Sequence, residues 1–306
     1  MVRSSDTQHR TGASSMTEPR VLLDGLAMVE SPRWHDDRLW FAHWGTEEIV
    51  AVDLDGNSEV VGHGPPGLGW SIDWLPDGRL LVTGQELVRR EPDGSMARHA
   101  DLSSITEYGW NEIVVDGRGN TYVNSLGFDF GAGEEPTAGI IALITSDGSA
   151  RQVADGIQFP NGMVVTPDNS TLIISESFAG RLTAFDIAGD GTLSNRRAWA
   201  EGVGPDGICI DADGAIWTCS SDTRTHTGRD ESPEGEAIRV REGGEILERI
   251  QADRAIFACM LGGPERRTLF MMASEWRGIE HVDEAIADRT GRVLATEAPA
   301  PGVGWP

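Results

Sequence analysis

The sequence predicts an all-β fold, a six-bladed β-propeller, from three observations. Runs with helical periodicity are nearly absent from the 306 residues. Short apolar runs alternate instead with Asp-Gly, Pro-Asp and Gly-Gly turn signals. These runs recur six times, at about 40 to 50 residues, which is the size of one propeller blade. Two stacked β-sandwiches would have no reason to repeat at this interval. We therefore expect one domain over residues 20–306.

Each repeat begins with a turn that leads into an apolar strand, as in "LPDGRLLVT" and "TPDNSTLIIS". The six copies align on Leu39, Leu80, Thr121, Leu172, Ile216 and Leu269. A hairpin with a Gly-bearing turn follows each copy, for example "VAVDLDGNSEVV" and "IALITSDGSARQVA". Each unit therefore holds about four strands, as a propeller blade does.

The run "RVLLDGL" (Arg20–Leu26) precedes the first repeat and has no hairpin of its own. Because a ring of blades has to be closed, we expect this run to complete the sixth blade beside "GRVLAT". Residues 1–19 are polar and lack the apolar core of a secretory signal. We expect them to form a disordered tail and the protein to be cytoplasmic.

Composition narrows the class of partner. The chain carries 49 acidic and 25 basic residues, a net charge of −24, which would repel a nucleic acid backbone. No apolar window of about 18 residues could cross a membrane. The three cysteines form no CxxC pair, so we expect buried, reduced thiols. A small molecule is the expected partner, and the oligomeric state stays open.

Oxygen donors recur at one position of the repeat. The innermost strand of every blade lines the central channel, so equivalent positions at its start converge on one axis. Counted back from the aligned turns, these positions hold Glu30, Trp70 with Ser71, Asn111, Asn161, Asp206 and Cys259. Each Asn-Gly or Asp-Gly alone could be a simple turn. Two carboxylates and two amides in register instead predict a central site for a hard divalent cation.

The glycine after Asn161, in "FPNGM", is expected to let the backbone turn so that the amide faces the axis. Cys259 is the one soft ligand in the set, so a closed tetrahedral zinc site is not expected. No G-x-S-x-G, HExxH, GxGxxG or Walker motif provides another kind of site.

Other polar and aromatic residues near strand ends are candidates for substrate contacts, each with a structural role as the alternative. His43, in "FAHWG", could face the channel as an acid or base. Glu176, Asp222 and Glu275 each follow an apolar run. Four tryptophans could line an apolar mouth or pack between blades, namely Trp44, Trp70, Trp110 and Trp276.

The motifs "ESPRW", "WNEIVVDGRGNTYV", "FPNGM", "PDGICIDADGAIW" and "FACMLGG" resemble, in order and spacing, the SMP-30/gluconolactonase/LRE-like family. The resemblance covers roughly residues 26–306 and implies a six-bladed propeller with one divalent ion. It places metal ligands on Glu30, Asn161 and Asp206, and the favoured general base on Asp206. Asn111 falls on a position that is a ligand or a substrate contact.

Two positions deserve comparison with the sugar-acid lactonases of this family. Their substrate-binding Arg is replaced by Gly109, which argues against polyhydroxylated lactones, and their acidic residue after the third-blade strand corresponds to Asp129. The expected substrate contacts are therefore five residues, namely Asn111, Asp129, Trp110, His43 and Glu176. The Gly-rich stretch 127–139 is the expected lid.

The resemblance implies a hydrolase that opens a lactone, a cyclic carboxylic ester. The ion would polarise the carbonyl while Asp206 accepts a proton from water, and water activated by the ion itself is the competing account. Ca²⁺ is the expected ion, with Zn²⁺, Mg²⁺, Mn²⁺ and Fe²⁺ as alternatives. The same site could also serve phosphotriester hydrolysis or a lyase or isomerase step through an enolate, and a binding module with a structural ion is the non-catalytic alternative.

Overall fold

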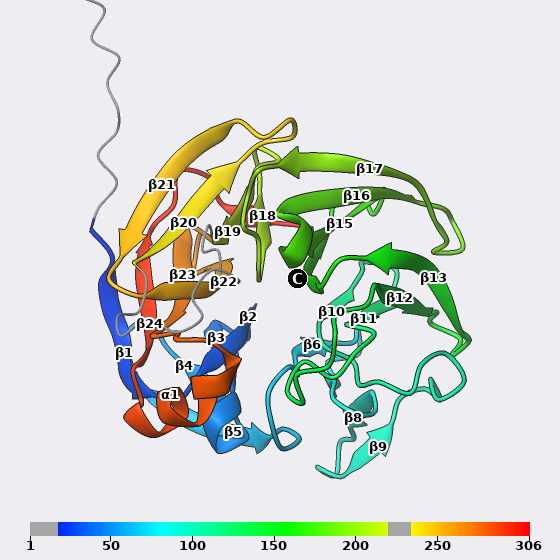
Figure 1. The fold of residues 1–306 in the computed structure, drawn as a ribbon, viewed down its shortest axis with the longest axis horizontal. Coiled ribbons are helices and arrows are strands. Elements are labelled where there is room, and N and C mark those ends of the chain that lie inside the picture. Colours follow the sequence, from blue (N-terminus) through cyan, green and yellow to red (C-terminus); the bar gives the residue numbers. More distant parts are fainter. Residues whose placement is uncertain (1–17, 220–233) are drawn as a thin grey trace, which may run out of the picture.

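The structure is a computed structural model that describes residues 18–219 and 234–306. Its strands form six antiparallel sheets arranged as the blades of a ring (Figure 1), which confirms the predicted six-bladed propeller. From the channel outwards, the first blade is formed by β2 (Val29–His35), β3 (Arg38–His43), β4 (Glu48–Val52) and β5 (Ser58–His63). The second is formed by β6 (Ile72–Trp74), β7 (Leu80–Val82), β8 (Val88–Arg90) and β9 (Met96–Arg98). The third is formed by β10 (Ile113–Val115), β11 (Thr121–Ser125), β12 (Gly139–Ile144) and β13 (Ala150–Ile157).

The other three blades follow the same order. The fourth is formed by β14 (Pro160–Val165), β15 (Thr171–Glu176), β16 (Arg181–Ile187) and β17 (Leu193–Glu201). The fifth is formed by β18 (Cys209–Asp211), β19 (Ile216–Cys219), β20 (Gly235–Val240) and β21 (Ile246–Ala252). The sixth is formed by β22 (Ala255–Gly262), β23 (Thr268–Ser274), β24 (Gly291–Glu297) and β1 (Arg20–Leu26). All six residues on which the repeats align lie in the second strand of their blade.

The ring closes as predicted, because β1 pairs with β24 as the outermost strand of the sixth blade. Arg20 lies opposite Ala295, and Leu26 lies opposite Gly291. An ion pair between Arg292 Nε and Asp24 Oδ1, 3.0 Å apart, fastens the same two strands. The first described strand is thus held by the last blade, which leaves β24 without a free edge.

Short helices cover part of one face. The connections between second and third strands carry η1 (Trp44–Thr46), η2 (Ser177–Ala179), and η3 (Ile279–His281) followed by α1 (Val282–Asp288). The α1 helix packs Ala285 into a cluster with Met28, Phe257 and Trp276. In the described part of the chain, no helix is long and apolar enough to cross a membrane.

The two ends of the channel differ. We call the face at which the innermost strands begin the upper face, and the opposite one the lower face. At the lower face, β25 (Gly302–Val303) pairs with the end of β18. Trp305 then exchanges backbone hydrogen bonds of 2.8 and 3.0 Å with Val165, the last residue of β14. The C-terminal segment therefore lies against the ends of the inner strands of the fourth and fifth blades, and Figure 1 shows the C-terminus near the centre of the ring.

Candidate active site

The four predicted oxygen donors lie together at the upper end of the channel. Glu30 is the second residue of β2 and Asn161 the second of β14, while Asn111 and Asp206 lie just before β10 and β18. Glu30 and Asn161 are 3% and 9% exposed, and Asn111 and Asp206 are half-buried. Four of the six inner strands, or the residues just before them, thus carry these side chains at the same end of the channel.

A small cavity lies among these strands. Its volume is about 10 Å³, the room that one water molecule or ion requires. Its walls come from five inner strands or the residues directly before them, and include Glu30, Arg33, Glu112, Gly162, Gly207 and Cys259. The cavity therefore lies on the axis to which the repeat directs its polar positions.

Irregular backbone aims two of the donors. The pairing of β2 with β3 shifts register between Glu30 and Arg33, and that of β14 with β15 shifts between Pro160 and Met163. Such bulges turn a side chain out of the regular alternation of a strand. Ser31 has a left-handed φ of 51°, and its backbone N–H donates to the Glu30 carboxylate.

The prediction that Gly162 turns the backbone beside Asn161 was wrong. Gly162 does not adopt a left-handed conformation, and Phe159 does, with φ 56°. Gly162 is needed for close packing instead: a Cβ there would lie 2.7 Å from the Ile208 nitrogen and 2.8 Å from the Asp206 carbonyl oxygen. The glycine therefore lets the fourth and fifth blades approach each other at the site.

A third carboxylate, Glu112, joins the site and was missed by the sequence reasoning, although it directly follows Asn111 in "WNE". It is 4% exposed and lines the cavity. Burial, followed by repulsion from Glu112 and Asp206, raises the pKa of Glu30 well above its usual range. Burial, followed by repulsion from Glu112, raises the pKa of Asp206 to about 8. A hydrogen bond with Asn161 lowers this pKa, but its effect is smaller. The site is thus an acidic cluster that a cation would stabilise.

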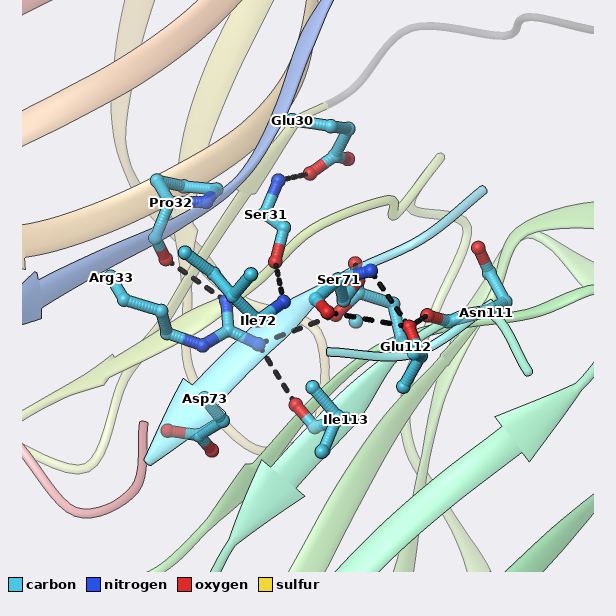
Figure 2. A network of polar contacts seen from close by, with 12 residues as sticks. Glu30, Ser31, Pro32, Arg33, Ser71, Ile72, Asp73, Asn111, Glu112 and Ile113 are labelled. Carbon is cyan, nitrogen blue, oxygen red and sulfur yellow. Dashed lines mark hydrogen bonds and ion pairs between the residues drawn. The ribbon is translucent and has the colours of Figure 1, made fainter. Parts of the chain in front are cut away.

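Polar neighbours fix the position of Glu112 (Figure 2). Ser71 Oγ donates to Glu112 Oε1 at 2.6 Å, and Arg33 Nη2 lies 3.4 Å from Glu112 Oε2. The same Arg33 nitrogen donates to the Ile113 carbonyl at 2.8 Å. These contacts join the first three blades, and they give Ser71, a member of the predicted ring, the role of orienting a carboxylate.

The two predicted amides are oriented through the fourth blade. Asn111 Nδ2 donates to the Pro160 carbonyl at 3.2 Å. Asn161 Oδ1 accepts from the Gly162 N–H at 2.9 Å, and its backbone carbonyl accepts from Asn124 Nδ2 at 2.8 Å. Asn124, in β11, is a second supporting residue that the sequence reasoning missed. Because each carbonyl oxygen has two lone pairs, both amides keep acceptor capacity for a ligand.

The donor set fits a hard cation. Within residues 18–219 and 234–306, no group of three or more His, Cys, Asp or Glu side chains is arranged to hold a metal ion. A cation at this position would therefore need the amide oxygens of Asn111 and Asn161 beside the carboxylates of Glu30 and Asp206. Carboxylate and amide oxygens are the ligands that Ca²⁺ prefers. The three cysteines are buried and form no disulfide, as expected.

Two of the predicted substrate contacts lie in structural networks. His43 is 3% exposed; its Nε2 accepts from the Ala27 N–H at 2.8 Å, and its Nδ1 lies 2.8 Å from Thr46 Oγ1. Glu176 is fully buried and bonds Arg181, Arg196 and Thr183. Both residues stabilise the connections between strands of their own blades, and neither lines the cavity.

Trp110 and Asp129 also lie apart from the cavity lining. Trp110 is 2% exposed and belongs to a core cluster with Leu81 and Ile113. Asp129 is exposed, and its Oδ1 accepts from the Ala132 N–H at 2.9 Å within the loop predicted as a lid.

The remaining tryptophans and acidic residues that the sequence offered as substrate contacts lie in the core or in surface ion pairs, or outside the described residues. Trp70 is 1% exposed and Trp276 7%, so both lie in the core, while Trp44 is half-buried. Glu275 pairs with Arg277, with Oε2 and Nη2 2.9 Å apart. Asp222 and the predicted tail up to residue 17 lie outside the described residues.

Comparison with known proteins agrees with this fold. A pentonolactonase of Haloferax volcanii is 26% identical, over 94% of this chain and 96% of its own. A diisopropyl-fluorophosphatase of Loligo vulgaris is 28% identical over 54% of this chain and 60% of its own. The crystal structure of regucalcin from Agrobacterium tumefaciens, described as a calcium-binding protein, superposes with a TM-score of 0.72 at 18% identity, over 94% of this chain and 97% of that one. The model of the SMP-30/gluconolactonase/LRE-like region matches residues 28–275, and the chain belongs to this family.

Proposed function

We propose that the protein is a lactonase that hydrolyses a cyclic ester with the help of one divalent cation, for which Ca²⁺ is the expected ion. The observation that carries this proposal is that Glu30, Asn111, Asn161 and Asp206 all lie at the starts of inner strands, at the end of the channel where Glu30 and the additional carboxylate of Glu112 line a cavity. Glu30 and Asp206 repel each other there, and Asn161 hydrogen-bonds Asp206. The pentonolactonase relative and the calcium-binding structural neighbour support the same reading.

The cation, when bound, would supply electrophilic stabilisation of the charge that develops on the lactone carbonyl oxygen. Asp206 is the proposed acceptor of the proton from the attacking water. Its backbone is fixed on both sides, because its carbonyl accepts from Ser175 Oγ at 2.7 Å and its N–H donates to Thr218 Oγ1 at 3.3 Å. This support fixes the backbone from which the carboxylate projects, which would favour a constant orientation of the proposed base.

A second candidate function, phosphotriester hydrolysis, is favoured by the likeness to the diisopropyl-fluorophosphatase. The same oxygen-lined site would stabilise the charge on a phosphoryl oxygen as well as on a carbonyl oxygen. Asp206 would accept the proton in either reaction, so an Asp206 variant should lose both activities. The two candidate functions are therefore distinguished by which substrate reacts.

The test measures turnover of a panel of five- and six-membered lactones and of a fluorophosphate ester, with Ca²⁺, Mg²⁺, Mn²⁺, Fe²⁺ and Zn²⁺ in turn. Asp206→Ala is expected to lose at least about a hundredfold in kcat/KM. Asp55→Ala, which removes an exposed carboxylate in the turn between β4 and β5, is the matched control and is expected to retain the wild-type rate.

Equal rates for Asp206→Ala and the wild type would refute the site. Turnover of the fluorophosphate alone would establish the second candidate. If chelation lowers the melting temperature and no substrate reacts, the propeller is a binding module with a structural ion.

A further inference from the structure

Four phenylalanines lie close together on the upper face, in three different loops between strands. The sequence alone does not predict that these loops meet. Phe128 and Phe130 lie between β11 and β12, Phe159 joins β13 to β14, and Phe178 lies in η2. The rings of Phe159 and Phe178 stack with centroids 4.2 Å apart, and Phe130 meets Phe159 edge-on at 5.1 Å. Phe128 is buried and lies 6.0 Å from Phe159. We call the half-buried Phe130, Phe159 and Phe178 the phenylalanine wall.

The phenylalanine wall adjoins the site through the chain itself. Phe159 precedes Asn161 by two residues, so their Cα atoms are at most about 7 Å apart. Ser177, directly before the last wall residue, donates its Oγ to the Pro205 carbonyl at 2.8 Å. Pro205 in turn directly precedes Asp206. The wall is therefore tied to two of the four oxygen donors.

The backbone holds Phe159 in a conformation that a phenylalanine disfavours. Its φ of 56° lies in the left-handed region, which is strained for a residue with a Cβ. The Phe159 carbonyl accepts from the Ser177 N–H at 3.2 Å, and the Gln158 carbonyl accepts from the Phe178 N–H at 3.3 Å. Glu176 Oε2 also accepts from the Gln158 N–H at 2.9 Å. The buried Glu176 therefore helps to fix the ring position.

We propose that the phenylalanine wall binds an aromatic substituent of the substrate, so that the substrate class is lactones bearing an aryl group. This inference rests on the proposed function, which places the lactone carbonyl at the oxygen donors. The three half-buried side chains are flat and apolar, and they carry no hydrogen-bonding atoms. A hydroxylated substituent would lose its hydrogen bonds to water there without replacement, whereas an aryl group would stack.

The test compares γ-phenyl-γ-butyrolactone with γ-methyl-γ-butyrolactone, which share one reacting ring. The wild type is expected to prefer the phenyl compound in kcat/KM. Phe178→Leu and Phe130→Leu should each reduce this preference by about three- to tenfold, mainly through KM, because a leucine keeps apolar contact but cannot stack. Met96→Leu, at an exposed apolar position in β9 on the outer edge of the second blade, is the control and should keep the wild-type preference. Melting temperatures verify that each variant is folded.

Calorimetric binding of the unreactive lactams 5-phenyl- and 5-methyl-2-pyrrolidinone separates the wall from the reaction. The inference is supported if the wild type binds the phenyl lactam more tightly than the methyl lactam and both wall variants bind the phenyl lactam more weakly than the wild type does. Equal binding of the two lactams by the wild type, or an unchanged preference in both variants, overturns it even if lactones are hydrolysed. A phenyl preference in lactam binding without any lactone turnover would support the wall and refute the proposed function.

Discussion

A methyl group placed on Gly162 would lie 2.8 Å from the carbonyl oxygen of Asp206, closer than packed atoms tolerate. We therefore expect Gly162→Ala to displace the Asp206 segment. The predicted loss is about 1 to 3 kcal/mol in unfolding free energy, together with weaker cation binding. Gly189→Ala is the control, because a Cβ there meets nothing within 4 Å and the residue is not left-handed. Urea denaturation and calorimetric titration with Ca²⁺ test both variants, and parallel behaviour of the two would contradict this role for Gly162.

Asp206 gives the chelated protein a distinct pH dependence. The carboxyl ionises at about 3.9 in the unfolded chain but at about 8 in the folded one. Between these values the folded state binds more protons, so this group's contribution to stability falls as pH rises.

In EDTA, Asp206→Asn should match the wild type at about pH 4 and below, where the carboxyl is protonated in both states, and become increasingly more stable than it toward pH 8. With saturating Ca²⁺ the order should reverse at pH 8, because the amide is a weaker ligand than the carboxylate. Thermal unfolding across this pH range measures both trends. A constant difference in melting temperature at every pH in EDTA would argue against the raised pKa of Asp206.

Glu112 should act on the site through its charge. Glu112→Gln retains an oxygen that can accept from Ser71 but removes the repulsion that contributes to the raised pKa values of Glu30 and Asp206. We expect the pKa of Asp206 to fall below about 8 and Ca²⁺ affinity to decrease, since the field that attracts the cation is weaker.

Carbon-detected NMR titration of the carboxyl groups, and Ca²⁺ titration at constant ionic strength, measure these two effects of Glu112→Gln. Glu86→Gln, a change of an exposed carboxylate, should alter neither quantity. An unchanged Asp206 titration in Glu112→Gln would show that burial alone sets its pKa.

The closure of the ring predicts how much of the N-terminus can be removed. A chain that begins at Arg20 keeps β1 and should melt within about 2 to 4 °C of the full-length protein, the shift expected for roughly 1 kcal/mol. A chain that begins at Ala27 lacks β1 and exposes the edge of β24, so it should melt earlier and aggregate. Thermal unfolding and light scattering distinguish the two. Equal stability of both truncated chains would contradict closure by β1.

The repeat made most of the fold predictable. Turn residues and apolar alternation mark each strand locally, so the second strands could be aligned, and Arg20–Leu26 could be assigned to the last blade because it lacked a partner of its own. The four oxygen donors followed from the same register. The prediction of one domain over residues 20–306 and the assignment of individual roles to the site residues stay predictions.

The supporting residues could not be predicted because their contacts cross blades. Glu112 is held by Ser71 and Arg33, which precede it by 41 and 79 positions, and no local pattern links such residues. The same limit explains why His43 and Glu176 were expected at the substrate. Each lies near a strand end at the upper face, but His43 contacts Thr46, Glu176 contacts Arg196, and neither lines the cavity.

The pairing of Trp305 with Val165 fastens the last residues of the chain to the inner strand of the fourth blade, and β25 fastens them to the inner strand of the fifth. The first described strand, β1, is fastened instead to the outermost position of the sixth blade. The ring is therefore closed at its rim by one end of the described chain and tied at its hub by the other.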